Sequence, residues 1–568
     1  MASAPALTDR DLASVQEARR LAQKAKTALP KLAELTQEQI DRIVDAMAAA
    51  VRPHAEALAR LAVEETGFGV VEDKVEKNLF ATDRVYEFIR PMRTVGVIAR
   101  DETKKVIEIA EPFGVVAAVV PSTNPTSTAI YKILIALKAR CPIVLSPHPS
   151  AARCITRVAE IMAEAASAAG APDGAVNWMH TVSLEGTQEL MKHRDVAVIL
   201  ATGGMGLVRA AYSAGKPAYG VGPGNAPCFI ERTADLAKAA ADIIVGKAFD
   251  NGVLCSSPNS VVVEDAVATE VKREFERQGA HFLNPADAAK LAAALVTPQR
   301  LPNTKLVGKS AKFIAADVGF TVPDGTRVLI AELAGVGRDF PLSIEKLCPV
   351  LSYYVVADWQ EGCERCKQIL RYGGMGHTMS IHSRNEQVIL EFGLKKPAFR
   401  IVVNTPTTHG SIGLSTGLDP SMTLGCGGWG GNITSDNISP KHLLNIKRLA
   451  YETRPVTRPA SGVAPRAAQH SDGRRGQPPL PRPPDTSLAQ GVDRAALARQ
   501  VASVAGMSAP TSAAPESSAV VAFVCEEDVR QAIKLGRKIV VGDRTIITPA
   551  ARDLANDHKV FVMQSWPR

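Results

Sequence analysis

The chain has 568 residues, 46% of them hydrophobic, and its mean hydropathy is +0.01, which is enough for a multi-domain globular protein with a large core. The formal net charge is +8, but residues 454–484 alone contain six arginines and a single acid, Asp472. Since much of the positive charge belongs to one short segment, the composition argues against a nucleic-acid-binding protein.

The cysteines and the N-terminus indicate a reducing compartment. The nine cysteines lack the spacing of a disulfide framework, residues 1–6 lack the pattern of a signal peptide, and no apolar run reaches about 18 residues. We therefore expect a cytoplasmic protein with free thiols and no membrane segment. The one CxxC, Cys363 to Cys366, has no second pair at zinc spacing, so we expect no metal site.

Helices are predicted at the start of the chain. Residues 8–29 open with the capping-box pattern Thr8-x-x-Asp11 and repeat small apolar residues along one helical face. We therefore assign residues 1–30 to an N-terminal helix. A second helical stretch is predicted over residues 37–61.

From about residue 113 short apolar strands alternate with helices. The predicted strands are 113–120, 142–146 and 196–201, and the predicted helices are 126–140, 151–169 and 206–214. This alternation with short Gly/Pro connections is typical of an α/β fold with a doubly wound parallel sheet. Ligands bind such sheets at the carboxyl ends of the strands, so segments 121–126, 146–150 and 202–206 are the expected places for a site.

A second set of strands predicts a second α/β domain. These strands include residues 260–263, 328–331 and 351–356. We place the first domain at 31–230, completed by part of 400–453, the second at 231–440, and the end of the core at 441–454.

The composition changes after Arg454. Eight prolines mark residues 455–486 as a Pro/Arg-rich linker of disordered or polyproline II type. An amphipathic helix is predicted within 487–506, with Leu497, Val501 and Val504 on one side, and a second linker occupies 507–519. A small module follows at 520–568, with a helix over 526–535, a strand over 538–541 and a turn at Asp543-Arg544. This tail is either a targeting extension or a solvated segment.

Cys255 and Asn124 are candidate catalytic residues. Cys255 lies in a small polar segment directly after a helical run, which fits a reactive thiol, although a buried structural cysteine fits this context too. Asn124 follows a buried strand, and Pro125 disfavours its joining the next helix. Its carboxamide could donate to a developing oxyanion or could cap the helix at Thr126. The residues themselves leave both alternatives open.

Five motifs follow one another along the chain. They are Val120-Pro121-Ser122-Thr123-Asn124-Pro125, Ala201-Thr202-Gly203-Gly204, Gly220-Val221-Gly222-Pro223-Gly224-Asn225, the Cys255 segment, and Glu345-Lys346-Leu347-Cys348-Pro349-Val350. In this order they resemble the aldehyde dehydrogenase superfamily, and specifically its CoA-acylating branch, typified by bacterial propionaldehyde and acetaldehyde dehydrogenases. The resemblance covers about residues 30–453. It implies a Rossmann-type doubly wound cofactor domain and an α/β catalytic domain that carries the nucleophilic cysteine, with a flexible C-terminal extension.

The resemblance implies a role for each of these segments. Cys255 would be the nucleophile, and Asn124 and the Cys255 backbone N–H would form the oxyanion hole. Glu345 would hold the nicotinamide ribose of NAD. The pyrophosphate would lie on Thr202, Gly203 and Gly204 at a helix N-terminus. Further cofactor contacts are expected from Thr123, Ser146, Pro147, His148, Val221, Gly222 and Leu347.

Val221 separates two branches of the family. Hydrolytic members carry a water-activating glutamate, and alignment places Val221 at that position, 34 residues before Cys255, with no acid between Tyr212 and Ile230. Because valine cannot abstract a proton, a thioester on Cys255 would await the thiol of coenzyme A, which is more nucleophilic than water.

The segment after the second strand concerns the adenosine half of the cofactor, and two histidines are candidates for acid/base chemistry. Ser146-Pro147-His148-Pro149 replaces the Lys-Pro-Ser-Glu-like segment of hydrolytic members, so NAD is expected, with NADP as the alternative. We expect His148 to be a loop histidine without a catalytic role. His377 is either packed, which we favour, or an acid/base near the CoA thiol.

The expected reaction is CoA-dependent oxidation of propionaldehyde, or next acetaldehyde, with NAD as oxidant. The tail resembles the encapsulation peptides of bacterial microcompartment enzymes, which implies a compartment lumen, shell proteins as partners, and, from the family, a homodimer or homotetramer. The alternatives are a hydrolytic aldehyde dehydrogenase and a catalytically idle compartment scaffold.

Overall fold

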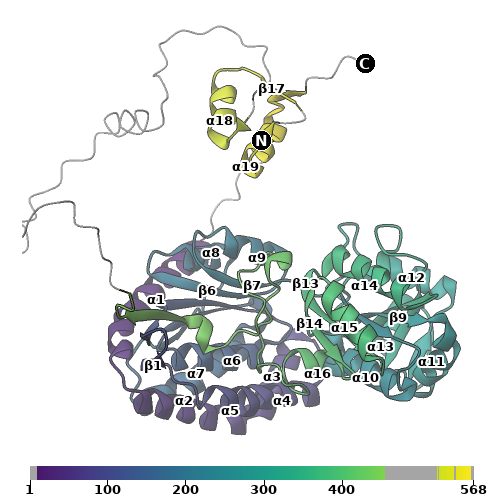
Figure 1. Ribbon diagram of the computed structural model, residues 1–568, viewed down its shortest axis with the longest axis horizontal. Coiled ribbons are helices and arrows are strands. Elements are labelled where there is room, and N and C mark those ends of the chain that lie inside the picture. The colour runs from purple at the N-terminus through teal and green to yellow at the C-terminus, as the bar shows by residue number, and fades with distance from the viewer. Residues whose placement is uncertain (1–8, 455–520, 522, 543–544, 564–568) are drawn as a thin grey trace, which may run out of the picture. The chain divides into compact units, whose positions relative to one another are not determined.

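The computed structural model describes residues 9–454, 521, 523–542 and 545–563. The chain divides into two compact units, Met1–Arg458 and Pro459–Arg568, and each is described by itself (Figure 1). The predicted linkers 455–486 and 507–519, the helix within 487–506 and the Asp543-Arg544 turn lie outside the described residues. The flexibility expected of the C-terminal extension likewise concerns mostly residues that the structure does not describe.

Helices form the first part of the larger unit. They are α1 (Asp9–Ala33), α2 (Gln37–Val51), α3 (Ala55–Thr66) and α4 (Val71–Leu79), which continues through the π-helical η2 (Phe80–Val85) into α5 (Tyr86–Ile89). The prediction of one helical stretch over 37–61 is wrong. The 3-10 turn η1 (Arg52–His54) separates α2 from α3, and Pro53 within it has no N–H to continue the α-helical ladder.

The first sheet has five parallel strands in the order β5-β4-β3-β6-β7. The strands are β3 (Val115–Val120), β4 (Ile143–Pro147), β5 (Val176–Trp178), β6 (Val196–Thr202) and β7 (Ala218–Val221). The helices between them are α6 (Pro125–Lys138), α7 (Ala152–Ala168), α8 (Leu184–Lys192) and α9 (Met205–Tyr212). The doubly wound parallel sheet is thus confirmed, and its order reverses between β3 and β6, where such sheets bind ligands.

The second sheet has seven parallel strands in the order β10-β11-β12-β9-β8-β13-β14. The strands are β8 (Ala226–Ile230), β9 (Pro258–Glu264), β10 (Ala280–Phe282), β11 (Val328–Glu332), β12 (Val350–Val356), β13 (Gly376–His382) and β14 (Ala398–Val403). The helices are α10 (Leu236–Ala248), α11 (Asp265–Arg277), α12 (Pro285–Leu295), α13 (Ala311–Val318), α14 (Trp359–Gly373), α15 (Glu386–Lys395) and α16 (Thr407–Ser411). Strand β8 pairs with β9 and β13 in this sheet, and the domain boundary expected at residue 230 stays a prediction.

A small antiparallel sheet joins distant parts of the larger unit. It contains β1 (Gly96–Asp101), β2 (Val106–Pro112) and β15 (Leu444–Ala450), in the order β1-β2-β15. The end of the core at 441–454 therefore returns to pair with a segment that precedes the first parallel sheet. The assignment of residues within 400–453 to the first domain stays a prediction.

The smaller unit has its own core. Strand β16 (Phe523–Val524) pairs with β18 (Ile546–Ile547), and β17 (Ile539–Val541) pairs with β19 (Phe561–Met563), all in parallel. Helices α18 (Glu526–Lys534) and α19 (Pro549–His558) accompany them, and the buried residues include Val524, Val529, Val541 and Val560. The predicted helix and strand of this module agree with α18 and β17. Across the described parts of the chain, the helices are all too short or too polar to cross a membrane.

Candidate active site

A cavity of about 460 Å³ lies between the two parallel sheets of the larger unit. The first sheet contributes the segments that follow β3, β4, β6 and β7, at the carboxyl ends of those strands. The second sheet contributes the segments that precede β9 and β12, at the amino ends. Of the expected site residues, the following line this cavity: Thr123, Asn124, Pro147, His148, Thr202, Gly203, Gly204, Val221, Gly222, Cys255, Glu345 and Leu347.

Ser146 is the exception among the expected cofactor contacts. It is fully buried at the end of β4 and is absent from the cavity wall. Its hydroxyl pairs with the Thr187 hydroxyl at 2.8 Å, and Thr187 on α8 lines the cavity. The cofactor contact expected of Ser146 therefore stays a prediction. In this structure its side chain, on a strand buried on both faces, points into the protein and contacts Thr187.

Cys255 is a half-buried thiol in the loop between α10 and β9. Burial, with a smaller contribution from the nearby Glu345 carboxyl, raises the pKa of this thiol to about 12, and the Arg400 guanidinium opposes the shift. The thiol is therefore protonated in the free protein near neutral pH, and its ionisation requires either higher pH or a positive charge brought into the cavity.

Gly224 is required by the close approach of the Cys255 backbone. A Cβ atom at Gly224 would lie 2.1 Å from the Cys255 carbonyl oxygen, a distance that forces one of the two segments to move. The Gly224 N–H also donates to Glu345 Oε1 at 2.8 Å. The glycine turn after β7 therefore packs directly against both the nucleophile loop and the Glu345 loop.

Asn124 occupies the N-cap position of α6, but its side chain makes no capping hydrogen bond. Its Oδ1 instead accepts a hydrogen bond from Lys77 Nζ at 2.6 Å, and its Nδ2 donates to Thr123 Oγ1 at 3.2 Å. This geometry decides against the helix-capping alternative. The Nδ2 group has two N–H donors, so the one that Thr123 does not engage remains for a ligand in the cavity.

The N-terminus of α9 is suited to a phosphate. Gly204 is its N-cap and, like the other residues of this turn, provides no side-chain cap to the first N–H groups of the helix. Gly203 and Gly204 line the cavity, and a Cβ at Gly204 would meet nothing within 4 Å. Among the described residues, the buried Thr202 hydroxyl finds no hydrogen-bond partner. An anionic ligand would satisfy both, and the pyrophosphate of a dinucleotide fits this position.

Glu345 and Leu347 form the opposite wall, in the loop before β12. Burial raises the pKa of the Glu345 carboxyl to about 7, and the Gly224 N–H and two buried lysines partly offset this shift. Leu347 has a φ of 49°, in the left-handed region that non-glycine residues rarely adopt. Such strain is retained at functional sites where the surrounding structure enforces it.

Val221 lies at the end of β7, is 3% exposed and lines the cavity. Among the lining residues in the described part of the chain, Glu345 alone carries a carboxylate, and that group already accepts the Gly224 N–H. The position at which hydrolytic relatives are expected to carry a base is therefore apolar in three dimensions as well as in the alignment.

The two candidate histidines differ in their surroundings. His148 lies at the cavity edge, where its Nδ1 accepts the Ser150 N–H at 3.2 Å. His377 is buried and does not line the cavity, its Nδ1 is 2.9 Å from the Thr378 hydroxyl, and burial lowers its pKa to about 3. His377 is therefore neutral near pH 7. Its ring packs beside Gly224, since a Cβ there would lie 3.1 Å from His377 Cγ.

Sequence reasoning missed part of the cavity wall. Val182, Ser183, Leu184 and Thr187 line it from the start of α8, and Leu207 lines it from α9. Ser183 caps α8 by accepting the Gly186 N–H, a pattern readable in sequence, but its place beside the cavity follows from the sheet order. In the described residues no group of three metal-ligating side chains occurs. Cys363 and Cys366 are buried on α14.

Comparison with known proteins adds to this geometry. A model of the aldehyde dehydrogenase family matches residues 3–318. The bifunctional aldehyde-alcohol dehydrogenase of Escherichia coli strain K12 is 43% identical over 442 residues, which are 77% of this chain and 50% of that protein. The chain thus spans about half the length of the first curated relatives that it matches.

Two solved structures resemble the larger unit. The acetylating aldehyde dehydrogenase from Geobacillus thermoglucosidasius is 50% identical, with a TM-score of 0.78 over 80% of this chain and 100% of that chain. The propionaldehyde dehydrogenase from the fucose utilisation bacterial microcompartment of Clostridium phytofermentans is 28% identical, with a TM-score of 0.68 over 77% of this chain and 98% of that chain.

Proposed function

The chain belongs to the aldehyde dehydrogenase family, and from this premise we propose that it converts a short-chain aldehyde and coenzyme A into an acyl-CoA thioester. The observation that carries the proposal is the apolar Val221 in the wall that Cys255 shares. Valine supplies no base at this position, and Glu345, the one carboxyl group among the described lining residues, already accepts the Gly224 N–H. A thiol is therefore the expected acceptor of an acyl group on Cys255.

The first half of the reaction uses Cys255 and Asn124. The Cys255 thiol releases its proton to solvent, the resulting thiolate adds to the aldehyde carbon, and the carbonyl oxygen becomes an oxyanion. The Asn124 side-chain N–H and the Cys255 backbone N–H donate to this oxyanion, and such donors typically contribute about 3–4 kcal/mol to the transition state. When bound, NAD supplies the hydride acceptor that turns the thiohemiacetal into a thioester.

The second half releases the acyl group. The thiolate of coenzyme A attacks the Cys255 thioester, the same donors hold the new oxyanion, and the Cys255 thiolate leaves. The overall balance is aldehyde, NAD⁺ and CoA thiol going to acyl-CoA, NADH and a proton. The step is reversible because one thioester replaces another.

The residues for cofactor binding divide between the two cavity walls. Thr202, Gly203 and Gly204 would hold the pyrophosphate, where the unpartnered Thr202 hydroxyl and the uncapped N-terminus of α9 support this assignment. Glu345 would accept hydrogen bonds from the ribose hydroxyls. NAD is the proposed cofactor and NADP the alternative, since neither an acid nor a lysine lines the wall beside Pro147 and His148.

The cavity favours an uncharged aldehyde. None of its lining residues in the described part of the chain is a lysine or an arginine that would pair with an acidic substrate. We propose propionaldehyde or acetaldehyde. The microcompartment relative supports the former, and the acetylating relative supports the latter. Comparison of kcat/KM for the two aldehydes decides between them.

The assay that tests the proposal is NADH formation from each aldehyde, with and without coenzyme A. Turnover that requires coenzyme A and yields acyl-CoA is the expected result. Acid produced without coenzyme A would establish the hydrolytic alternative, and absence of turnover under both conditions would favour a compartment scaffold.

For the tail we propose encapsulation in a bacterial microcompartment. The basic, proline-rich composition of residues 455–486 and the apolar repeat at Leu497, Val501 and Val504 support this proposal. Deletion of residues 455–568 should leave turnover unchanged and abolish co-purification with shell proteins. Loss of turnover would instead give the tail a structural role. A homodimer or homotetramer, proposed from the family, is tested by light scattering.

A further inference from the structure

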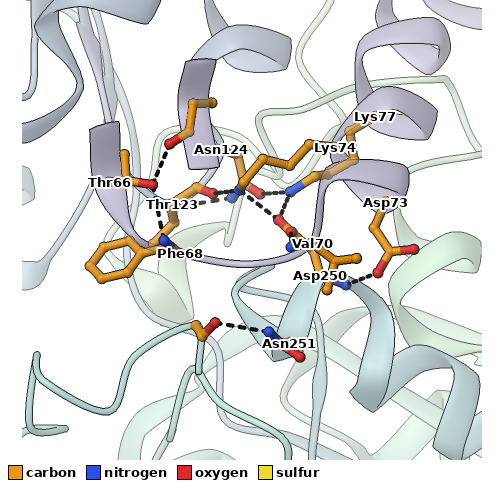
Figure 2. Close-up of polar contacts among 12 residues, drawn as sticks. Thr66, Phe68, Val70, Asp73, Lys74, Lys77, Thr123, Asn124, Asp250 and Asn251 are labelled. Carbon is orange, nitrogen blue, oxygen red and sulfur yellow. Dashed lines mark hydrogen bonds and ion pairs between the residues drawn. The ribbon is translucent and has the colours of Figure 1, made fainter. Parts of the chain in front are cut away.

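A buried cluster of charges lies behind the catalytic loops. The Asp250 carboxylate is completely buried, and its Oδ2 accepts hydrogen bonds from Lys74 Nζ at 2.9 Å and from Lys77 Nζ. Its Oδ1 accepts the Val70 N–H at 2.7 Å. Both lysines are 2% exposed and lie one turn apart on α4 (Figure 2).

The lysines connect this carboxylate to the turn that carries Asn124. Lys77 Nζ donates to Asn124 Oδ1 at 2.6 Å, and Lys74 Nζ donates to the Thr123 carbonyl at 3.2 Å. Figure 2 shows the two ammonium groups between Asp250 and residues 123–124. One carboxylate therefore links the turn after β3 to the loop that carries the nucleophile, since Asp250 precedes Cys255 by only five residues.

The backbone at Asp250 is shaped by these contacts. Asp250 and Asn251 have φ angles of 49° and 52°, in the left-handed region. The Asp250 N–H donates to Asp73 Oδ2 at 2.6 Å. Side chains of α4 therefore hold both the backbone N–H and the carboxylate of Asp250 in this strained turn. Burying these three charged side chains costs free energy, and their arrangement is specific. The Asp250 carboxylate bridges the two lysine ammonium groups, and each ammonium group also donates a hydrogen bond to the turn that contains Asn124.

Lys77 differs from Lys74 in what it contacts beyond Asp250. A carboxamide has one acceptor end and one donor end, so an ammonium fixed at Asn124 Oδ1 also determines where Nδ2 lies. A cation at the oxygen withdraws electron density from the amide and makes its N–H a stronger donor. Burial lowers the pKa of Lys77 to about 8, which leaves it mostly protonated at pH 7.

We propose that Lys77 is a positioning residue that orients and polarises the Asn124 carboxamide for the oxyanion formed on Cys255. Asp250 keeps the Lys77 ammonium in place. Lys74 serves the backbone of the same turn and has no contact with the carboxamide among those described. This inference rests on the proposed function, because it assigns Asn124 the oxyanion.

The test is a double-mutant cycle on kcat. Lys77→Met keeps much of the side-chain volume and removes the ammonium, and Lys74→Met is the matched control on the same helix. Lys77→Met should lower kcat about 10- to 100-fold with the KM values nearly unchanged, because the lost interaction is made only in the transition state. Lys74→Met should cost markedly less. In an Asn124→Ala background, Lys77→Met should have no further effect on kcat.

Two results would overturn the proposal. One is an equal loss of kcat from Lys77→Met with and without Asn124, and the other is a raised KM with unchanged kcat. If Lys77→Met fails to fold because Asp250 is left uncompensated, Lys77→Met combined with Asp250→Asn removes both charges and is measured in the same cycle against Asp250→Asn alone. Wild-type protein that shows no CoA-dependent NADH formation would instead defeat the proposed function, so the two failures are distinguishable.

Discussion

The two parallel sheets present opposite ends to the same cavity. The first sheet contributes the carboxyl ends of β3, β4, β6 and β7, and the second contributes the segments before β9 and β12. On the first side the proposed pyrophosphate site is formed mainly by backbone N–H groups and glycines. On the second side Cys255 and Glu345 are side chains with strongly shifted pKa values.

This difference separates binding from chemistry. A site made of helix N–H groups depends on the backbone, which the sheet already holds. A site made of a thiol and a carboxyl group depends on how far each group is desolvated and on what lies beside it. Asn124 belongs by position to the first sheet, but through Lys77 it is coupled to the loop of the second. Substitutions on the second side and at Asn124 should therefore affect kcat, and those at the α9 N-terminus should affect cofactor binding.

The largest effect is expected at the nucleophile. Cys255→Ala removes the only group that forms the thioester, so kcat should fall by at least about 10⁴-fold. Transfer of the acyl group from propionyl-CoA to the protein, measured by mass spectrometry of the intact chain, should disappear as well. Unchanged thermal unfolding serves as the control. Persistent acylation of the variant would place the nucleophile at another cysteine.

Asn124→Ala should have the next largest effect. Loss of one oxyanion donor lowers kcat by about 10²- to 10³-fold in comparable sites, whereas cofactor binding is unaffected. Steady-state kinetics and a cofactor titration by fluorescence measure the two quantities separately. A change confined to cofactor affinity would assign Asn124 to the binding side of the cavity.

Gly224→Ala tests the contact between the two sides. Its Cβ would lie 2.1 Å from the Cys255 carbonyl oxygen, and displacing a nucleophile by about 1 Å can cost about 10²-fold in rate. Gly393→Ala on α15 is the matched control, because a Cβ there meets nothing within 4 Å. Equal activity of the two variants would mean that the loop that carries Cys255 can shift without lowering the rate.

Thr202→Val should act on the binding side alone. The valine keeps the shape of threonine and removes the hydroxyl that has no partner among the described residues. Loss of one hydrogen bond to the cofactor, worth about 1 kcal/mol, should raise the KM for NAD about fivefold and leave kcat unchanged. Initial rates over a range of NAD concentrations provide the measurement. An unchanged KM would remove Thr202 from the cofactor contacts.

The smallest expected effect is a pH dependence of cofactor affinity. Burial raises the pKa of Glu345 to about 7, so the carboxylate that accepts ribose hydroxyls is present above this pH and is lost as the pH falls through it. The KM for NAD should therefore rise a few-fold on acidification, and Glu345→Gln should abolish this dependence. A pH-independent KM in the wild-type protein would contradict the ribose contact.

Much of the cavity wall that the first sheet contributes could be predicted from the sequence. Apolar strands such as Val115–Val120 are buried on both faces, so they appear as continuous runs, and the rule for doubly wound sheets points to their carboxyl ends. The sequence of a short strand end, such as Ser146-Pro147, does not reveal which side chain faces the cavity. The helix boundary near Arg52 was missed because the apolar repeat continues across it.

The sequence by itself identified the family motifs, the doubly wound sheet, and Val221 where a base would stand, since these depend on local pattern and residue order. Only the tertiary structure decided that the second sheet faces the cavity with its amino ends. It also decided that Lys77, 47 residues before Asn124, holds that carboxamide. Contacts of this length follow from how helices pack on sheets, and buried charges in particular are explained only by the partners that folding brings to them.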